Sequence, residues 1–120
     1  MSMPRPDEAT RAYFHSLLPE DPRITVRPMF GNLAGFVNGN MFTGIFGSSV
    51  FVRLPPEDRA ELLTLPGAAV FAPMEGRPMS EYVTLPDPWR DEPERARAWL
   101  LRSLAWAVAL PPKEPKKRRR

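Results

Sequence analysis

Two turn signals separate three apolar runs in the middle of the chain, and they constrain the fold more than any other feature. Asn38-Gly39 strongly favours a two-residue hairpin, because a type I′ turn needs positive φ at both central residues. Gly47-Ser48 suits a type II′ turn, which takes glycine first. We therefore predict a three-stranded antiparallel meander, with strands over residues 33–37, 40–46 and 49–54.

The side chains of this meander are apolar on both faces. Strict alternation places Ile45 and Val52 on one face, and it places three aromatic residues on the other, namely Phe42, Phe46 and Phe51. One face should carry the helices, while the aromatic face is too apolar to be left in water. We expect the third helix or another subunit to cover the aromatic face.

The remaining elements follow from apolar spacing and from the chain's sixteen prolines. The pairs Tyr13–Leu17 and Phe14–Leu18 favour an amphipathic first helix. Because Pro28 cannot donate to a β-ladder, the strand before it should end or bulge there. In chain order we predict a helix over residues 7–18, a strand over 24–27, a helix over about 55–65, and strands over 69–72 and 80–85 joined by a long connection over 73–79.

The last helix has the clearest pattern. Asp91-Glu92-Pro93 is typical of a helix start, with acidic residues ahead of a proline in the first turn. Pro111-Pro112 ends the helix. Between these limits, apolar or small residues recur at the spacing of one helix face: Ala96, Trp99, Leu100, Ser103, Leu104 and Ala107.

This order of elements, with mostly hairpin links, indicates an α+β fold. We predict a single domain over residues 1–112, in which an antiparallel β-sheet (the meander plus a second hairpin) packs with about three helices. The chain has no cysteine, no run of 18 apolar residues and no apolar leader at its N-terminus. These features favour a cytoplasmic protein without a membrane span.

The basic character of the chain is concentrated at its C-terminus. Residues 113–120 carry six basic side chains and one acidic one, net +5, which leaves −2 for the rest of a chain whose total is +3. We predict a disordered basic tail, because the segment is charged and of low complexity. Such a tail could contact nucleic-acid phosphates without reading sequence, through Lys113, Lys116, Lys117, Arg118, Arg119 and Arg120.

No residue pattern indicates catalysis. His15 is the only histidine, and metal sites need several ligands, but the sequence contains no His/Cys cluster. No nucleophile-elbow pattern surrounds Ser48, Ser49 or Ser80, and the glycines match no phosphate-binding loop. We therefore expect no enzyme activity, no catalytic or metal site and no cofactor, and we interpret His15 as a solvent-edge residue of the first helix.

Two arginines in similar surroundings are candidates for a binding contact. Arg27 and Arg77 each precede Pro-Met beside an apolar strand. They could contact an anion or an acidic partner, or they could form salt bridges that close the sheet, with Glu75 or Glu81 as the candidate carboxylates. The four methionines at positions 29, 41, 74 and 79 could likewise form an adaptable binding surface, or they could fill the core.

Several of these residues also carry a family resemblance. Arg27-x-Met29-Phe30-Gly31, Asn38-Gly39-x-Met41-Phe42 and Gly76-Arg77-Pro78-Met79-Ser80 resemble motifs of the TfoX/Sxy N-terminal-domain family, which is named for bacterial regulators of natural competence. The similarity covers roughly residues 23–110. It departs from the family pattern at two positions. Asn32 stands where a second glycine is common, and Glu81 lies beside the single aromatic residue Tyr82 where paired aromatic residues are common.

The resemblance implies a role in transcription regulation through partners rather than catalysis. We therefore expect a non-enzymatic regulatory or protein-interaction module with a protein partner, and a homodimer is an alternative left open. One alternative is a nucleic-acid-associated protein that acts through its tail. Another is a small-molecule-binding or enzymatic domain.

Overall fold

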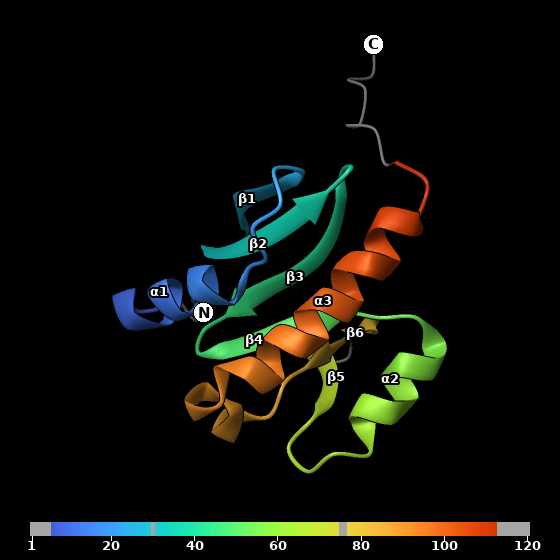
Figure 1. Cartoon of the computed structure of the whole chain (residues 1–120). Coiled ribbons are helices and arrows are strands. Elements are labelled where there is room, and N and C mark those ends of the chain that lie inside the picture. Colours follow the sequence, from blue (N-terminus) through green and yellow to red (C-terminus); the bar gives the residue numbers. More distant parts are fainter. Residues whose placement is uncertain (1–5, 30, 75–76, 113–120) are drawn as a thin grey trace.

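The protein folds around one six-stranded antiparallel sheet with the strand order β1-β2-β3-β4-β6-β5 (Figure 1). This computed structural model describes residues 6–29, 31–74 and 77–112. The strands are β1 (Ile24–Met29), β2 (Asn32–Val37), β3 (Asn40–Phe46), β4 (Ser49–Arg53), β5 (Ala69–Met74) and β6 (Arg77–Thr84). The helices are α1 (Glu8–Leu17), α2 (Pro56–Leu63) and α3 (Pro93–Ala109), with a short 3-10 helix η1 (Asp87–Asp91) before α3. The predicted α+β class is therefore confirmed.

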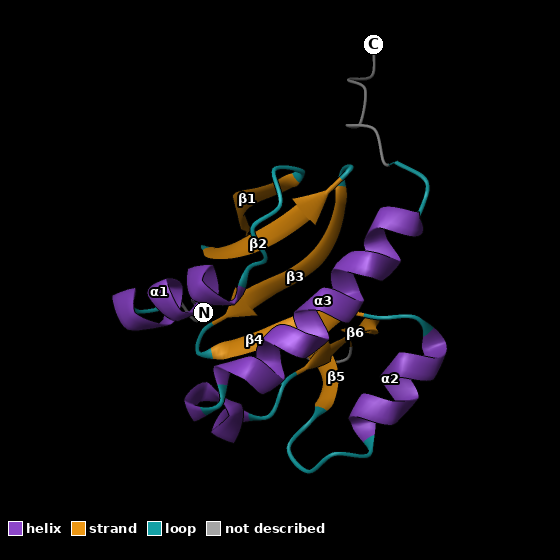
Figure 2. Cartoon of the chain, viewed as in Figure 1, coloured by secondary structure: helices purple, strands orange, loops and turns teal. Residues whose placement is uncertain are grey.

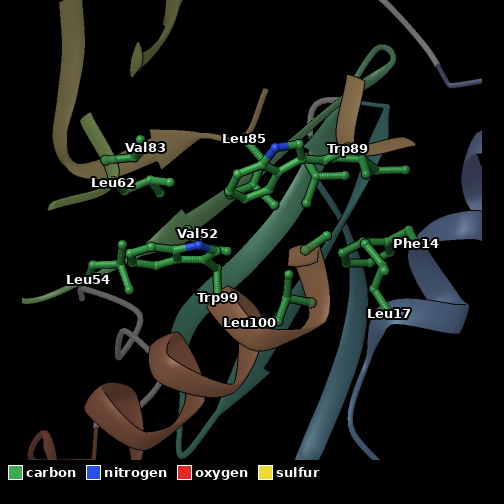
Figure 3. Close-up of a cluster of buried hydrophobic side chains, with 13 residues drawn as sticks. Phe14, Leu17, Val52, Leu54, Leu62, Val83, Leu85, Trp89, Trp99 and Leu100 are labelled. Carbon is green, nitrogen blue, oxygen red and sulfur yellow. The ribbon is translucent and has the colours of Figure 1, made fainter. Parts of the chain in front are cut away.

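The helices lie on one face of the sheet. Helix α3 runs across the sheet, and α1 and α2 flank α3 (Figure 2). The buried cluster between these layers takes side chains from all three helices, and Phe14, Leu17, Trp99 and Leu100 point toward the sheet (Figure 3). All six residues of the stripe predicted for α3 are buried. Among the described residues no helix packs on the opposite face, which we call the open face. None of these helices is long and apolar enough to cross a bilayer.

The meander forms as predicted. Asn38 and Gly39 have φ of 52° and 79°, as a type I′ turn requires. Gly47 has φ of 63°, the value that glycine supplies at the first position of a type II′ turn. The strands that these turns join pair in antiparallel register, with Val37 opposite Asn40 and Phe46 opposite Ser49.

The first turn yields a direct test. Replacing Gly39 with valine should lower the free energy of unfolding by at least about 1 kcal/mol, because a β-branched residue resists positive φ. Denaturant titration of the variant and the parent protein measures the difference. An unchanged midpoint would contradict the role assigned to this turn.

Strand β1 corrects one expectation. It does not end or bulge at Pro28 but continues in regular register to Met29, with Pro28 opposite Leu33. The physical reason is that β1 is an edge strand. A proline can occupy an edge when its nitrogen faces away from the neighbouring strand, because no ladder hydrogen bond is then lost.

The second hairpin differs from the expectation in its loop. Strand β5 continues to Met74 and β6 begins at Arg77, so the predicted long connection over residues 73–79 is mostly strand. The pairing is irregular, because Val70 lies opposite Val83 but Phe71 lies opposite Met79. Proline in this segment suggested a loop, whereas Pro73 lies in β5, an edge strand whose register shifts between Phe71 and Met74.

A bulge in β3 corrects the assignment of the faces. Gly35 lies opposite Thr43 while Phe36 lies opposite Met41, so Phe42 is an extra residue in β3. The ring of Phe42 therefore packs on the helix side, in a cluster with Leu104 and Ala107 of α3. The hydroxyl of buried Ser103 donates to the carbonyl of Phe42 at 2.5 Å, which fastens α3 to the bulge.

Candidate functional site

Part of the open face is covered by the chain itself. The ring of Phe71, on β5, stacks on Phe51 of β4 with 4.1 Å between centroids and 12° between planes. Phe71 also meets Phe46 edge-on at 5.7 Å. Phe51 is fully buried and Phe46 is half-buried. Within the chain, the expected cover for these rings thus comes from β5 rather than from the third helix.

The other part of the open face is a groove of about 340 Å³. Its floor comes from five strands and from the β2–β3 turn, and it combines three methionines, two aromatic rings and one ion pair. The residues that line it are Met29, Phe36, Gly39, Asn40, Met41, Arg53, Met79, Glu81 and Tyr82. Three of the four methionines considered from the sequence therefore come together here, whereas the side chain of Met74 lies outside the described part.

Two arginines lie on the aromatic rings of this face. The guanidinium of Arg27 is 4.2 Å from the centroid of Phe36, and that of Arg53 is 5.8 Å from the centroid of Tyr82. Arg53 also bridges to Glu81, with 2.8 Å between Nη2 and Oε1. Cations held over aromatic faces are attracted by the ring quadrupole, and this attraction keeps both charges beside the groove.

A hydrogen bond orients the ring of Tyr82. Its hydroxyl donates to the carbonyl of Met41 across the groove at 3.2 Å. Burial raises the pKa of Tyr82, so the phenol stays neutral and keeps its proton for this bond at neutral pH. The bond ties β6 to β3 although β4 lies between them, and it gives the groove a fixed floor.

Only some of the residues proposed from the sequence as binding contacts lie at this site. Arg27 is exposed on the open face and has no carboxylate partner among the described residues. Arg77 opens β6, but its side chain lies outside the described part of the chain, as do the tail cations of residues 113–120. Sequence reasoning missed Arg53, whose guanidinium pairs with the carboxylate of Glu81.

The segment that follows α3 lies at one end of the groove. The side-chain amide of Asn40 donates to the carbonyl of Pro111 at 3.0 Å. Asn40 is the first residue of β3 and lines the groove with Gly39. Pro111 therefore lies beside the β2–β3 turn.

His15 lies outside this site. It is exposed on α1, and its ring meets Phe14 at a tilt, with 6.1 Å between centroids. Within residues 6–29, 31–74 and 77–112, no group of three His, Cys, Asp or Glu side chains is arranged to hold a metal ion.

The exposure of His15 leads to a second prediction. His15→Ala should change the free energy of unfolding by less than about 0.5 kcal/mol and should leave partner binding intact, because an exposed side chain with one ring contact contributes little. Thermal unfolding and a zinc titration of both proteins check this. Stoichiometric zinc that is bound by the parent and lost by the variant would be the contrary result.

Fold and site together define a class: an α+β domain with helices on one face of an antiparallel sheet and a methionine-lined groove on the other. The family model of the TfoX N-terminal domain matches residues 5–107. The chain therefore belongs to the TfoX N-terminal domain family, which at family level makes it a competence-related regulatory domain. None of the curated proteins compared with the chain matches it.

Proposed function

We propose that this protein is a non-enzymatic, cytoplasmic regulatory module that acts in transcription by binding a protein partner through the groove on its open face. One observation carries the proposal: Met29, Met41 and Met79 line the same groove beside two aromatic rings. Methionine side chains are flexible and polarizable, so a surface made of them adapts to apolar side chains of a partner.

The edges of the sheet are poor alternatives for binding. A partner can add a strand only where an edge offers free N–H groups. Both edge strands contain a proline, Pro28 in β1 and Pro73 in β5, and a proline has no N–H to offer. The groove is therefore the surface that we assign to the partner.

Site-specific photo-crosslinking in living cells tests the proposal. A benzophenone amino acid replaces Phe36, which lines the groove, and in a matched control it replaces Leu101, which is 51% exposed on α3. We expect irradiation to join a protein of the transcription machinery to the position-36 variant and not to the position-101 variant. Equal products at both positions, or no protein product at position 36, would contradict the proposal.

A further inference from the structure

All the methionines whose side chains the structure describes line the groove, although they come from three different strands. Met29 belongs to β1, Met41 to β3 and Met79 to β6. The chain contains no cysteine, so thioether sulfur is its only sulfur. Resting on the proposed function, we propose that these three methionines are a site of reversible oxidation, at which a peroxide makes the apolar groove polar and so releases the partner.

The thioethers of the groove are open to a small oxidant. Each of the three side chains is half-buried rather than buried. The groove has a volume of about 340 Å³, many times what one water molecule requires, and hydrogen peroxide is only slightly larger than water. The oxidant can therefore reach the sulfur atoms without any opening of the fold.

The reaction transfers one oxygen atom from hydrogen peroxide to sulfur. A lone pair of the thioether attacks one peroxide oxygen, so an S–O bond forms and the O–O bond breaks. The departing hydroxide takes the proton of the transferred oxygen and leaves as water. Sulfur is oxidised by two electrons and the peroxide is reduced by two. The product, a sulfoxide, is polar and chiral, and methionine sulfoxide reductases convert it back to the thioether.

A sulfoxide oxygen would enter a groove that holds hydrogen-bond donors beside its apolar floor. The guanidinium of Arg53 and the hydroxyl of Tyr82 line the same groove, and that hydroxyl now donates to the carbonyl of Met41. The new oxygen is an acceptor for these donors, so it is stabilised when the groove is empty. An apolar side chain of a partner would have to cover it, and covering a polar group without a hydrogen bond weakens binding.

The packed core does not depend on these sulfur atoms. The buried hydrophobic residues in the described part of the chain are aliphatic or aromatic, and none is a methionine. The part of the open face that β5 covers is closed by phenylalanine rings. Oxidation in the groove therefore changes the binding surface while the core stays as it is, which distinguishes a switch from damage to the fold.

Peptide mapping by mass spectrometry locates the reaction in the full-length protein. Folded and urea-unfolded samples are treated with hydrogen peroxide for a series of times. We expect each of the three methionines to react in the folded protein within about ten-fold of its rate in urea, because susceptibility follows exposure. The urea midpoint of the oxidised protein should stay close to that of the parent.

Photo-crosslinking at position 36 then measures release of the partner. The purified benzophenone variant is oxidised, freed of peroxide, and irradiated in cell lysate beside an unoxidised sample. We expect the product with the transcription protein to fall by about five-fold or more on oxidation. Reduction of the oxidised sample by methionine sulfoxide reductases should restore the product.

Two sets of variants assign the effect to the groove. A protein with leucine at positions 29, 41 and 79 should keep the product and no longer respond to peroxide, because leucine and methionine are both apolar and similar in volume. Met41→Gln places a polar group in the groove and should lower the product about five-fold without any oxidant. Leu101→Gln makes a similar change at an exposed position of α3 and should leave the product unchanged.

Four results would overturn the inference. They are groove methionines that react more than about a hundred-fold slower in the folded protein than in urea, a product that is equal before and after oxidation, a large fall of the urea midpoint on oxidation, and a leucine variant that still loses its product with peroxide. Absence of any product from the unoxidised protein would instead count against the proposed function, whereas the peptide map decides the oxidation site by itself.

Discussion

Replacing Phe51 with alanine is expected to lower the free energy of unfolding by about 3–5 kcal/mol, the usual cost of removing a fully buried aromatic ring. Phe51 is 0% exposed in a sheet with helices on its other face. Its ring stacks on Phe71 and meets Tyr82 edge-on at 5.7 Å. The substitution therefore leaves a cavity at the place where β5 covers the open face.

Phe46→Ala is the matched control. Phe46 lies on the same face and also meets Phe71, but its side chain is half-buried. Its loss should cost clearly less than the loss of Phe51, because less apolar area returns to water. Urea titrations of the three proteins give the comparison. Equal costs would mean that Phe71 does not shield Phe51 as described.

Local patterns predicted much of this fold. The turn at Asn38-Gly39 could be predicted because positive φ at two successive residues restricts the residues allowed there. The buried stripe of α3 could be predicted because one face of a long helix repeats with a fixed period. Both signals are carried by residues close together in the sequence, so no knowledge of the rest of the fold was needed.

The errors arise where distant segments decide the outcome. The alternation of β3 failed at Phe42, because a bulge inserts one residue and turns that ring toward α3. Pro28 predicted a strand end because the sequence does not show that β1 is an edge strand. The cover on Phe51 comes from β5, whose position depends on the pairing of β6 with β4. None of these pairings is encoded locally.

The candidate site was predictable to a similar extent. Arg27 and the methionines attracted attention by their residue type, and the structure brings Arg27, Met29, Met41 and Met79 to one face. Arg53 was missed because its partner Glu81 is 28 residues away in the sequence. The position of the Arg53 guanidinium beside the groove follows from the β4–β6 register, which sets Arg53 opposite Tyr82.

The open face therefore has two parts with different physical roles. Where β5 covers it, aromatic rings bury one another and contribute to stability. Where the groove lies, the apolar floor remains accessible, although covering it would also stabilise the fold. An accessible apolar floor beside a cation that has no carboxylate partner among the described residues is the pattern expected of a binding surface rather than of a core.

Gly44 provides the last prediction, because it lies beneath the ring of its cross-strand neighbour Phe51. A Cβ at this position would lie 2.5 Å from Cζ of Phe51 and 2.9 Å from the carbonyl oxygen of Leu33. A fully buried ring and a strand backbone cannot both move aside. We expect Gly44→Ala to lower the free energy of unfolding by about 2–3 kcal/mol, within the range of overpacked cores.

Two further proteins make this test specific. Gly35→Ala is the milder comparison, because a Cβ there would lie 3.1 Å from the methyl carbon of Thr43 and 3.3 Å from the ring of Phe42, distances that require these side chains to give by only a few tenths of an ångström. It should cost less than about 1 kcal/mol. In a Phe51→Leu background the cost of Gly44→Ala should fall by roughly 1 kcal/mol, because the ring is gone but the Leu33 carbonyl remains. Strict additivity in this double-mutant cycle, measured by urea titration, would show that the ring of Phe51 is not what excludes a side chain at position 44.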